Sequence, residues 1–590
     1  MCGICGYLSL NGGSASIQTI ESMMDAMRSR GPDAMGMFSQ GEGALGHRRL
    51  KIIDLSESAQ QPMIDNHLGL SIVYNGAIYN YKQLRSKLED KGYRFFSSGD
   101  TEVILKAYHA WGKGCLKHFN GMIAFAIQHR DSGKVFLARY LLVIKPLYYS
   151  WNANELRFAS SLPALLPGGN IDTDIDAIAL NYYMTFHAVV PAPRSILKGV
   201  KKLPPASTLT IEANGDIHEE KYWELTFAPS DAEAEYDFSD WQENLKIELR
   251  DAVQRRLTAD VPVGVLLSGG VDSSLVVGLL AQEGQKELKT FSIGFESAGG
   301  EKGDEFQYSD LIANYFQTDH HKIKVDSSRV LPSLEQCVKA MSEPMVSHDC
   351  IGFYLLSQEV AKHVKVVQSG QGADEIFAGY HWYPPMMESS DPVRDYASVF
   401  FDRSFEEYKS AVHPRFAKKD YSSLFVHRHF ENPGAAAPID KALRLDSTVM
   451  LIDDPVKRVD NMTMAWGLEA RVPFLDHELV EFVARIPAEH KVLHGGKHIL
   501  KKIAADIIPA EVIDRPKGYF PVPALKYFRG EYLDFVSEIL NAPSVKERQI
   551  FNRSYVDTIL KDPDAHITPL RGSKLWQMAL LEYWLTVHEI

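Results

Sequence analysis

A cysteine at position 2 is the first residue of this chain with a type and place suited to chemistry. If Met1 is removed, Cys2 carries a thiol and an α-amino group whose ordinary pKa of about 7.7 to 8.0 makes it a usable base near neutrality. Nucleophile and base would then lie on one residue. The alternatives are an accidental cysteine, or a redox or metal pair with Cys5. Residues 6–10 after this pair read as a strand, and no further ligands lie at a fitting spacing.

Polar residues suited to amide chemistry follow further along the chain. Attack of a thiolate on an amide creates an oxyanion, which the Asn75 side-chain amide and the Gly76 backbone N–H could stabilise. An α-amino-acid substrate also needs a cation for its carboxylate and an anion for its ammonium, and Arg49 and Asp100 are the candidates. Each of these residues, taken singly, would be interpreted as a surface or turn residue.

A glycine-rich run over residues 263–274, VGVLLSGGVDSS, precedes an apolar helix. A buried strand that enters such a turn presents backbone N–H groups and the positive end of the helix dipole to an anion, so the run predicts a phosphate site. It is neither a Walker A loop, because no Gly-Lys-Ser/Thr follows, nor a dinucleotide fingerprint. In this position the carboxylate of Asp272 is suited to bind a Mg²⁺ ion that bridges phosphates. The alternative is a structural glycine turn with a serine cap.

A second strand and glycine turn occur over residues 366–375, VVQSGQGADE. The paired carboxylates at its end suit a second metal or pyrophosphate contact at the same edge of an open sheet. Lys497, Arg515 and Lys517 are candidate cations for leaving phosphates, and solvated surface charges are the alternative for each.

These candidates fall into two regions with different hydrophobic patterns. Residues 1–211 show short alternating strands and amphipathic helices, which predicts a strand-rich α+β domain. Residues 212–240 are polar and acidic with little periodicity, which predicts a linker. Residues 241–590 alternate all-apolar runs with helical patterns and then become mostly helical, which predicts a parallel α/β domain with a helical C-terminal part.

Composition narrows the classes of protein. A chain of 590 residues should form at least two domains, and 45% hydrophobic with 24% charged residues is ordinary for a globular protein. The net charge of −13 disfavours bulk binding to nucleic acid. Five scattered cysteines indicate a reducing compartment, and neither a signal peptide nor an apolar stretch of about 18 residues is present, so we expect a cytoplasmic protein without membrane contact.

The assembled motifs resemble the glutamine-dependent asparagine synthetase family over nearly the whole chain. The specific marks are the runs MCGI at 1–4, RGPD at 30–33, NG with YN at 75–80, SGGVDSS at 268–274, SGQGADE at 369–375 and LEARVPFLD at 468–476. The resemblance implies an N-terminal-nucleophile glutaminase with stacked antiparallel sheets, followed by an ATP pyrophosphatase-type (PP-loop) synthetase. It further implies that ammonia passes through an internal tunnel to a carboxylate activated as its adenylate.

The resemblance also implies a role for each matching position. Cys2 would be the nucleophile, assisted by Asn75 and Gly76, with Arg49 and Asp100 holding glutamine. The residues at the ATP site would be Leu267, Ser268, Gly269, Gly270, Asp272, Ser273, Ser274, Ile293, Ser369, Gly370 and Gln371. Asp272 and Asp374 would bind Mg²⁺, and Lys497 would act on pyrophosphate.

Three positions depart from the family pattern. Family members commonly have Glu, which helps to bind the glutamine ammonium, where this chain has Ala77. They also have Glu where this chain has Gln371, and a neutral amide cannot take a proton from ammonia, so a base must come from elsewhere or the acceptor differs. Val143 replaces a glycine; if that glycine has a positive φ, the turn must be remodelled, which predicts a shifted or disordered loop.

The acceptor is the least determined part of the function. Residues 369–372, 378–385 and 514–525 look more like the branch that amidates N-acetylglutaminylglutamine, a small osmoprotectant dipeptide, than like true asparagine synthetases. We therefore rank such a dipeptide first and aspartate second. A tRNA-modifying PP-loop enzyme and a non-catalytic scaffold are the remaining hypotheses. The sequence does not determine the oligomeric state, and a homodimer is one possibility.

Overall fold

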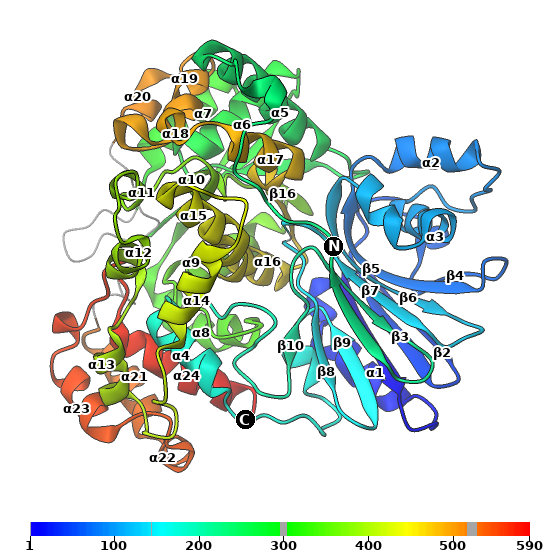
Figure 1. Ribbon diagram of the computed structural model, residues 1–590, viewed down its shortest axis with the longest axis horizontal. Helices are drawn as coiled ribbons and strands as arrows, with labels where there is room; N and C mark the ends of the chain where they lie inside the picture. The colour runs from blue at the N-terminus through cyan, green and yellow to red at the C-terminus, as the bar shows by residue number, and fades with distance from the viewer. Residues whose placement is uncertain (1, 143, 296–303, 516–527) are drawn as a thin grey trace.

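The computed structural model describes residues 2–142, 144–295, 304–515 and 528–590. Two six-stranded antiparallel sheets form the first half, in the orders β10-β8-β9-β1-β3-β2 and β12-β11-β7-β6-β5-β4. A five-stranded parallel sheet of order β15-β14-β13-β16-β17, surrounded by helices, forms the second half (Figure 1). The expected fold class, an N-terminal-nucleophile amidotransferase domain followed by a parallel α/β domain with a helical C-terminal part, is confirmed.

The strands of the two antiparallel sheets are β1 (Gly3–Ser9), β2 (Ala34–Gln40), β3 (Gly43–Arg49), β4 (Met63–Asp65), β5 (Leu70–Ile78), β6 (Gly121–His129), β7 (Val135–Arg139), β8 (Tyr148–Trp151), β9 (Glu155–Ala159), β10 (Lys201–Lys202), β11 (Ser207–Ile211) and β12 (Ile217–Lys221). The parallel sheet contains β13 (Val263–Leu266), β14 (Lys289–Phe295), β15 (Asp319–Val325), β16 (Val366–Gln368) and β17 (Glu469–Arg471).

The helices of the first half are α1 (Ile17–Ala26), α2 (Tyr81–Glu89), α3 (Asp100–Trp111) and α4 (Ala177–Thr185). Those of the second half up to β17 are α5 (Phe238–Arg255), α6 (Val271–Gln282), α7 (Phe306–Phe316), α8 (Val330–Lys339), α9 (Asp349–Val360), α10 (Ala373–Ile376), α11 (Tyr383–Met386), α12 (Pro392–Phe400), α13 (Phe405–Ala411), α14 (Tyr421–Glu431), α15 (Pro438–Leu445) and α16 (Lys457–Met464). After β17 follow α17 (His477–Arg485), α18 (Ala488–Val492), α19 (His498–Ala504), α20 (Ala510–Ile513), α21 (Glu531–Asn541), α22 (Pro543–Arg548), α23 (Arg553–Lys561) and α24 (Lys574–Val587).

The two antiparallel sheets pack face to face. Apolar side chains of β1 and β3, such as Ile4 and Leu45, meet those of β5 to β7, such as Val73 and Leu137, in one buried cluster. Helices α2 and α3 cover the outer face of the second sheet, and α1 contacts β1 and β3 of the first. Strand alternation explains this layering, because successive side chains point to opposite faces and both faces here are covered.

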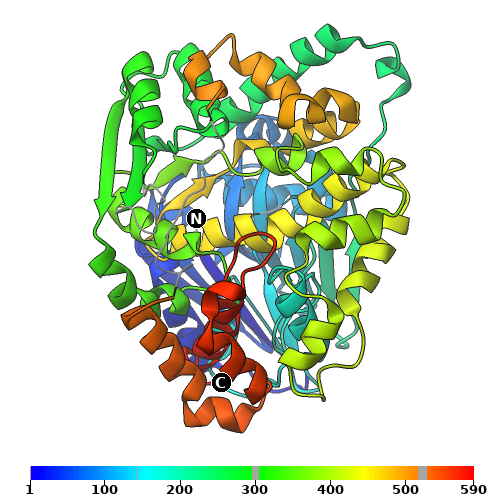
Figure 2. The ribbon, with the colours of Figure 1, turned by 90° about the vertical axis from the view of Figure 1, so that its left-hand side faces the viewer.

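The parallel sheet brings two strand ends to one edge. Strands β13 and β16 are neighbours, with Val265 opposite Gln368, and each runs directly into a glycine turn. Their apolar sequences fit a sheet that is covered on both faces. In Figure 2 the yellow helical run from α15 to α16 crosses in front of the blue sheets of the first half. This run includes two π-helical segments, residues 446–450 and 452–456.

Several parts of the fold differ from what the sequence predicts. The expected linker 212–240 contains β12, which pairs with β11 along its whole length, and α5 begins within it at Phe238. Strand β15 was not anticipated, because its sequence DHHKIKV is mostly polar, as befits a strand at the sheet edge. The prediction of a remodelled turn at Val143 falls outside the described residues.

Buried ion pairs join the two halves. Asp460 of α16 accepts from Arg30 Nη1 at 2.9 Å and from Lys145 Nζ at 2.6 Å. These three side chains are at most 7% exposed. A carboxylate buried to this degree persists in an apolar interior only when it is paired, so the contact fixes how the halves dock.

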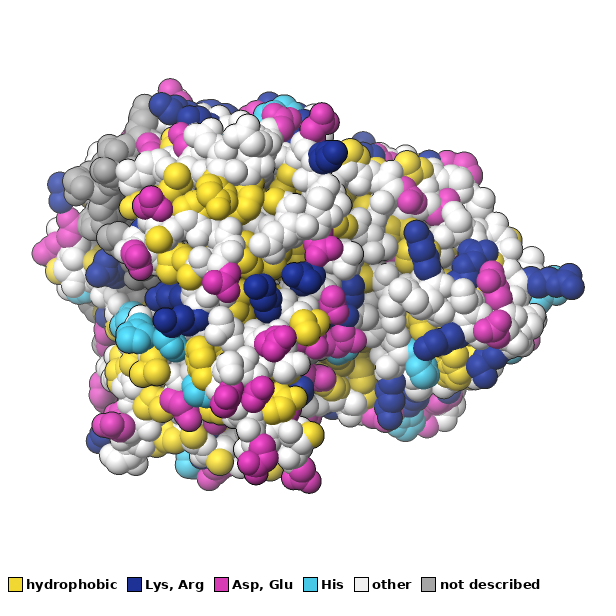
Figure 3. Space-filling view, turned by 90° about the horizontal axis from the view of Figure 1, so that it is seen from above, with side chains coloured by type: hydrophobic (Ala, Val, Ile, Leu, Met, Phe, Trp, Pro, Cys, Tyr) yellow, Lys and Arg dark blue, Asp and Glu magenta, His cyan; other side chains and the backbone are white. Residues whose placement is uncertain are grey.

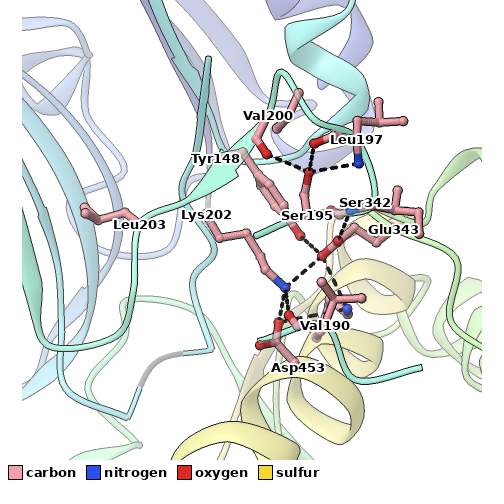
Figure 4. A network of polar contacts seen from close by, with 12 residues as sticks. Tyr148, Val190, Ser195, Leu197, Val200, Lys202, Leu203, Ser342, Glu343 and Asp453 are labelled. Carbon is pink, nitrogen blue, oxygen red and sulfur yellow. Dashed lines mark hydrogen bonds and ion pairs between the residues drawn. The ribbon is translucent and has the colours of Figure 1, made fainter. Parts of the chain in front are cut away.

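A second polar network lies nearby across the same boundary (Figure 4). Lys202 of β10 contacts Asp453 at 2.7 Å and Glu343 at 3.1 Å, and Tyr148 of β8 donates to Glu343 at 3.3 Å. Burial opposes the charge of Lys202, but the two carboxylates outweigh it and raise the pKa of the ammonium group. The docking surface is therefore charged as well as apolar.

The outer surface carries charges of both signs. On the face drawn in Figure 3, Lys and Arg side chains are interspersed with Asp and Glu. Within the described residues, none of the helices combines the length and apolar character needed to cross a membrane.

Candidate active sites

Cys2 lies immediately before β1 and next to β5. Its backbone N–H donates to Asn75 Oδ1 at 3.0 Å, and both residues are buried. The Asn75 Nδ2 group is also buried and has no hydrogen-bond partner among the described residues. Native proteins rarely leave a buried donor unsatisfied, so a group of this kind beside a thiol suggests a function. The Nδ2 group can donate a hydrogen bond to the oxyanion that forms during attack on an amide.

Gly76 follows at a point where no side chain fits. A Cβ at this position would lie 2.0 Å from the Met122 backbone oxygen of β6, and the φ angle is +159°. The close approach of β5 and β6 therefore requires glycine here. This explains on steric grounds why glycine stands next to Asn75.

Arg49 and Asp100 are placed by the surrounding backbone. Arg49 ends β3 and donates to the backbone oxygens of Ser56, at 2.8 Å, and Asp54. Asp100 begins α3 and accepts from the Tyr74 hydroxyl at 2.9 Å and from the backbone of β5 at 3.0 Å. Burial raises the pKa of the Asp100 carboxyl to about 6. Both side chains are thus held by their surroundings rather than mobile in solvent.

Cys2, Arg49, Gly76 and Asp100 line one small cavity, whereas Asn75, which the sequence assigns to the same site, is not on its wall. The volume of this cavity is about 30 Å³. Burial raises the pKa of the Cys2 thiol, so the thiolate forms only with a base close by. Ala77 is on the wall, and so is Glu469 of β17, which belongs to the other half of the chain.

A second and larger cavity, of about 460 Å³, opens at the edge of the parallel sheet. It brings together most of the predicted nucleotide-site residues: Leu267, Ser268, Gly270, Asp272, Ser273, Ile293, Ser369, Gly370, Gln371, Asp374 and Lys497. Gly269 and Ser274 belong to the same turn and helix start but are buried behind the cavity wall.

The turn after β13 is held by its own serines. The Ser268 backbone N–H donates to Ser273 Oγ at 3.2 Å, and the Gly270 N–H donates to Ser268 Oγ at 3.3 Å. Gly269 has φ +76°, and a Cβ there would lie 2.7 Å from the Ser309 backbone nitrogen. A glycine is therefore required for the turn to pack against α7 and lead into α6.

Lys497 joins the two carboxylates that the sequence assigns to a metal. Its Nζ lies 2.7 Å from Asp272 Oδ2 and 2.9 Å from Asp374 Oδ1. Burial opposes the ammonium charge, but these carboxylates outweigh it and raise the pKa of Lys497. The two glycine turns thus direct their acidic side chains at one cation.

This arrangement fits Mg²⁺ in a particular way. Magnesium commonly takes one or two carboxylates and completes its shell with water and substrate phosphates. Across the described ranges, no group of three or more His, Cys, Asp or Glu side chains could hold a metal alone. Asp272 and Asp374 therefore suit an ion that arrives with a nucleotide.

Two more residues that the sequence singled out lie on this cavity. Glu375 is the second of the paired carboxylates, and burial together with the charge of Asp374 raises the pKa of its carboxyl to about 8. Arg515, a candidate cation, lies on the wall and pairs with Glu305 at 2.9 Å. Lys517, the other candidate in that run, falls outside the described residues.

One short strand lies between the two cavities. Glu469, at the start of β17, lines the cavity of Cys2. Two residues later the Arg471 backbone oxygen accepts from the Ser369 N–H at 2.9 Å, and Ser369 lines the larger cavity. The β16–β17 ladder therefore connects the walls of the two cavities.

Stacked antiparallel sheets with a cysteine beside an unpaired amide, followed by a parallel sheet with a phosphate-type turn, define a two-domain amidotransferase. Two family models match the chain: a glutamine amidotransferase domain over residues 1–223 and an asparagine synthase over residues 244–586. The chain belongs to the glutamine-hydrolysing asparagine synthetase family, and it is a ligase of this type.

Similar proteins extend over nearly its whole length. Asparagine synthetase [glutamine-hydrolyzing] 1 of Bacillus subtilis (strain 168) is 31% identical, covering 100% of this chain and 97% of the relative. Asparagine synthetase [glutamine-hydrolyzing] 3 of the same strain is 32% identical, covering 92% and 89%. The amidase chry2 of Gibberella zeae is 26% identical, covering 94% and 93%. Full-length similarity therefore extends to a protein with a different name, and the acceptor is not fixed by it.

Proposed function

We propose that this ligase hydrolyses glutamine at Cys2 and transfers the ammonia to a carboxylate activated by ATP, releasing AMP and pyrophosphate. The observation that carries the proposal is the strand pair β16–β17, one end of which lines the cavity of Cys2 while the other lies beside the phosphate-type turns. Two cavities connected in this way are suited to a reaction in which one site makes an intermediate and the other consumes it.

The first reaction uses the residues around Cys2. After loss of Met1, the Cys2 α-amino group takes the thiol proton, and the thiolate sulfur attacks the side-chain amide carbon of glutamine. The Asn75 Nδ2 and Gly76 N–H groups donate to the oxyanion. As it collapses, the leaving NH2 group takes the thiol proton from the Cys2 ammonium and departs as ammonia, and water then hydrolyses the thioester to glutamate.

The second reaction uses the glycine turns. A carboxylate oxygen of the acceptor attacks the α-phosphorus of ATP, pyrophosphate leaves, and Lys497 balances its charge. Mg²⁺, held by Asp272 and Asp374, would neutralise phosphate charge. The ammonia nitrogen then attacks the acyl carbon of the adenylate, AMP leaves, and an amide remains. Adenylation is needed because a carboxylate oxygen is a poor leaving group at neutral pH.

For the acceptor we propose an N-acetylglutaminylglutamine-type dipeptide. Support comes from residues 369–372, 378–385 and 514–525, which resemble the branch that amidates this compound. It also comes from Gln371, a neutral residue where asparagine synthetases commonly have Glu. Aspartate is the second candidate, favoured by the similarity to the two Bacillus subtilis asparagine synthetases.

The test is pyrophosphate release with ATP, Mg²⁺ and ammonia across candidate acceptors. The dipeptide should support turnover, and aspartate should support less. Turnover with aspartate alone would reverse the ranking, whereas specific tRNA binding at moderate salt would favour a PP-loop tRNA-modifying enzyme. Absence of both glutamine hydrolysis and ATP turnover would favour a non-catalytic scaffold. The cytoplasmic location and the homodimer stay predictions.

A further inference from the structure

The glutaminase cavity contains one wall residue from the synthetase half. Glu469 is the first residue of β17 and pairs with Val366 of β16, so the parallel sheet fixes its position. Its side chain is 1% exposed and lines the same cavity as Cys2, Arg49 and Asp100. The charge of Glu469 influences both Cys2 and Asp100. A carboxylate so placed can act on a ligand bound beside the thiol.

The cavity offers an amino-acid substrate a clear partner for only one of its two charged groups. The α-carboxylate of the substrate can pair with the guanidinium of Arg49, but the α-ammonium group needs an anion. Ala77 offers none. Asp100 already accepts two hydrogen bonds, and burial raises its pKa to about 6, so its charge is incomplete in mildly acidic conditions.

Glu469 behaves differently from Asp100. Burial opposes its charge, but cations outweigh burial and hold the pKa of the Glu469 carboxyl below its ordinary value, first the amino group at the start of the chain and then Arg471. Arg471 is one of these cations, with Nε 2.5 Å from Glu469 Oε1. The Arg471 guanidinium is itself anchored, since Nη1 donates to the Arg256 backbone oxygen at 2.7 Å. Glu469 is therefore a fixed negative charge throughout the neutral range.

We propose that Glu469 binds the α-ammonium group of glutamine, so that the synthetase domain contributes a substrate-binding residue to the glutaminase site. The inference rests on the proposed hydrolysis of glutamine at Cys2. It means that the glutaminase site is complete only when β17 lies against it. The carboxylate that binds the substrate ammonium then comes from a residue outside the glutaminase sheets.

The competing role for Glu469 is an action on the enzyme's own amine. A carboxylate near the α-amino group of Cys2 would change the pKa of that base and so affect every amide substrate equally. Binding of the substrate ammonium, by contrast, affects only substrates that carry one. The two roles are separable by comparing L-glutamine with 4-carbamoylbutanoate, which has the same amide and carboxylate but lacks the α-amino group.

The experiment measures kcat/KM for hydrolysis of both amides by the full chain and by Glu469→Gln. A charge-assisted contact of this kind predicts a fall of about 10- to 100-fold for glutamine, mainly in KM. The value for 4-carbamoylbutanoate should change less than about twofold. The matched control is Glu335→Gln, which removes an exposed carboxylate on α8, and it should alter neither value.

Ammonia-dependent pyrophosphate release by Glu469→Gln verifies that the synthetase half is folded. If this variant does not fold, Glu469→Asp keeps the charge but withdraws it by one methylene, and the ratio of the two kcat/KM values should fall for this variant as well. Equal losses for both amides, or a wild-type protein that does not prefer glutamine, would overturn the proposal. Glutamine hydrolysis that survives Cys2→Ala would instead refute the underlying function.

Discussion

The Lys145 ammonium lies 2.6 Å from the Asp460 carboxylate, and both side chains are completely buried where the two halves of the chain meet. Arg30 approaches the same carboxylate at 2.9 Å from another part of the first half. One aspartate of the synthetase half thus pairs with two cations of the glutaminase half. This contact helps to fix how the two halves dock.

Replacing Asp460 by Asn should therefore destabilise the protein strongly. The variant leaves Lys145 and Arg30 buried without their counter-charge, which typically costs about 3–5 kcal/mol. Urea unfolding measures the loss. Glu335→Gln, which breaks an exposed pair with Lys339, should cost less than about 1 kcal/mol. Equal midpoints for the two variants would show that the buried contact contributes little.

Cys2→Ala should separate the two reactions. It removes the nucleophile, so glutamine-dependent pyrophosphate release should be lost while ammonia-dependent release is kept. Cys5→Ala is the matched control, because Cys5 is buried in the core and has no role in the proposed reaction. Loss of glutamine hydrolysis in both variants would favour the alternative of a redox or metal pair.

Asn75→Ala should lower kcat for glutamine hydrolysis by about 10²- to 10³-fold, because it removes one oxyanion donor. The KM for glutamine should change much less. Asn120→Ala provides the comparison, since its Nδ2 is likewise buried without a partner in the described part of the chain, but the residue that accepts from the Cys2 N–H is Asn75. A change in KM alone would assign Asn75 to substrate binding.

Lys497→Met should lower ammonia-dependent pyrophosphate release by at least about 100-fold and leave glutamine hydrolysis intact. The substitution removes the cation between Asp272 and Asp374. Lys502→Met, which changes an exposed residue of the same helix, should have no effect. Retained release in Lys497→Met would rule out its action on pyrophosphate.

The pH dependence follows from Asp100. Its pKa of about 6 lies above the value of 3.8 for an ordinary aspartate, so the folded state binds its proton more tightly than the unfolded state. The group therefore stabilises the fold below pH 4 and loses this contribution as pH rises to about 6. Relative to the wild type, Asp100→Asn should lose less stability over this interval. Parallel stability curves for the two proteins would contradict the raised pKa.

The sequence predicts the cavity at the edge of the parallel sheet because that site depends on local motifs. The glycine turn at 268–274 follows a strand and opens a helix, so its residues reach one cavity whatever surrounds them. Arg49, Asn75 and Asp100 are distant from each other in sequence, and the resemblance supplies their common site. Fold class follows from the change in hydrophobic period near the middle of the chain.

The features that the sequence does not predict depend on tertiary contacts. Glu469 reaches the cavity of Cys2 only because the two halves dock, and a pattern of hydrophobic residues carries no signal for such a contact. Strand β12 lies in a polar stretch because it is an edge strand, with one side against β11 and the other outside the sheet. The pairing of Lys145 with Asp460 likewise spans the chain.

The measurement that tests the central claim most directly uses 6-diazo-5-oxo-L-norleucine, a glutamine analogue that alkylates nucleophiles. After treatment, mass spectrometry of the N-terminal peptide should show Met1 absent and the adduct on Cys2. Glutamine-dependent pyrophosphate release should be abolished, while ammonia-dependent release remains. A protein that uses glutamine at the normal rate with Met1 still attached, or that carries the adduct elsewhere, would contradict the account.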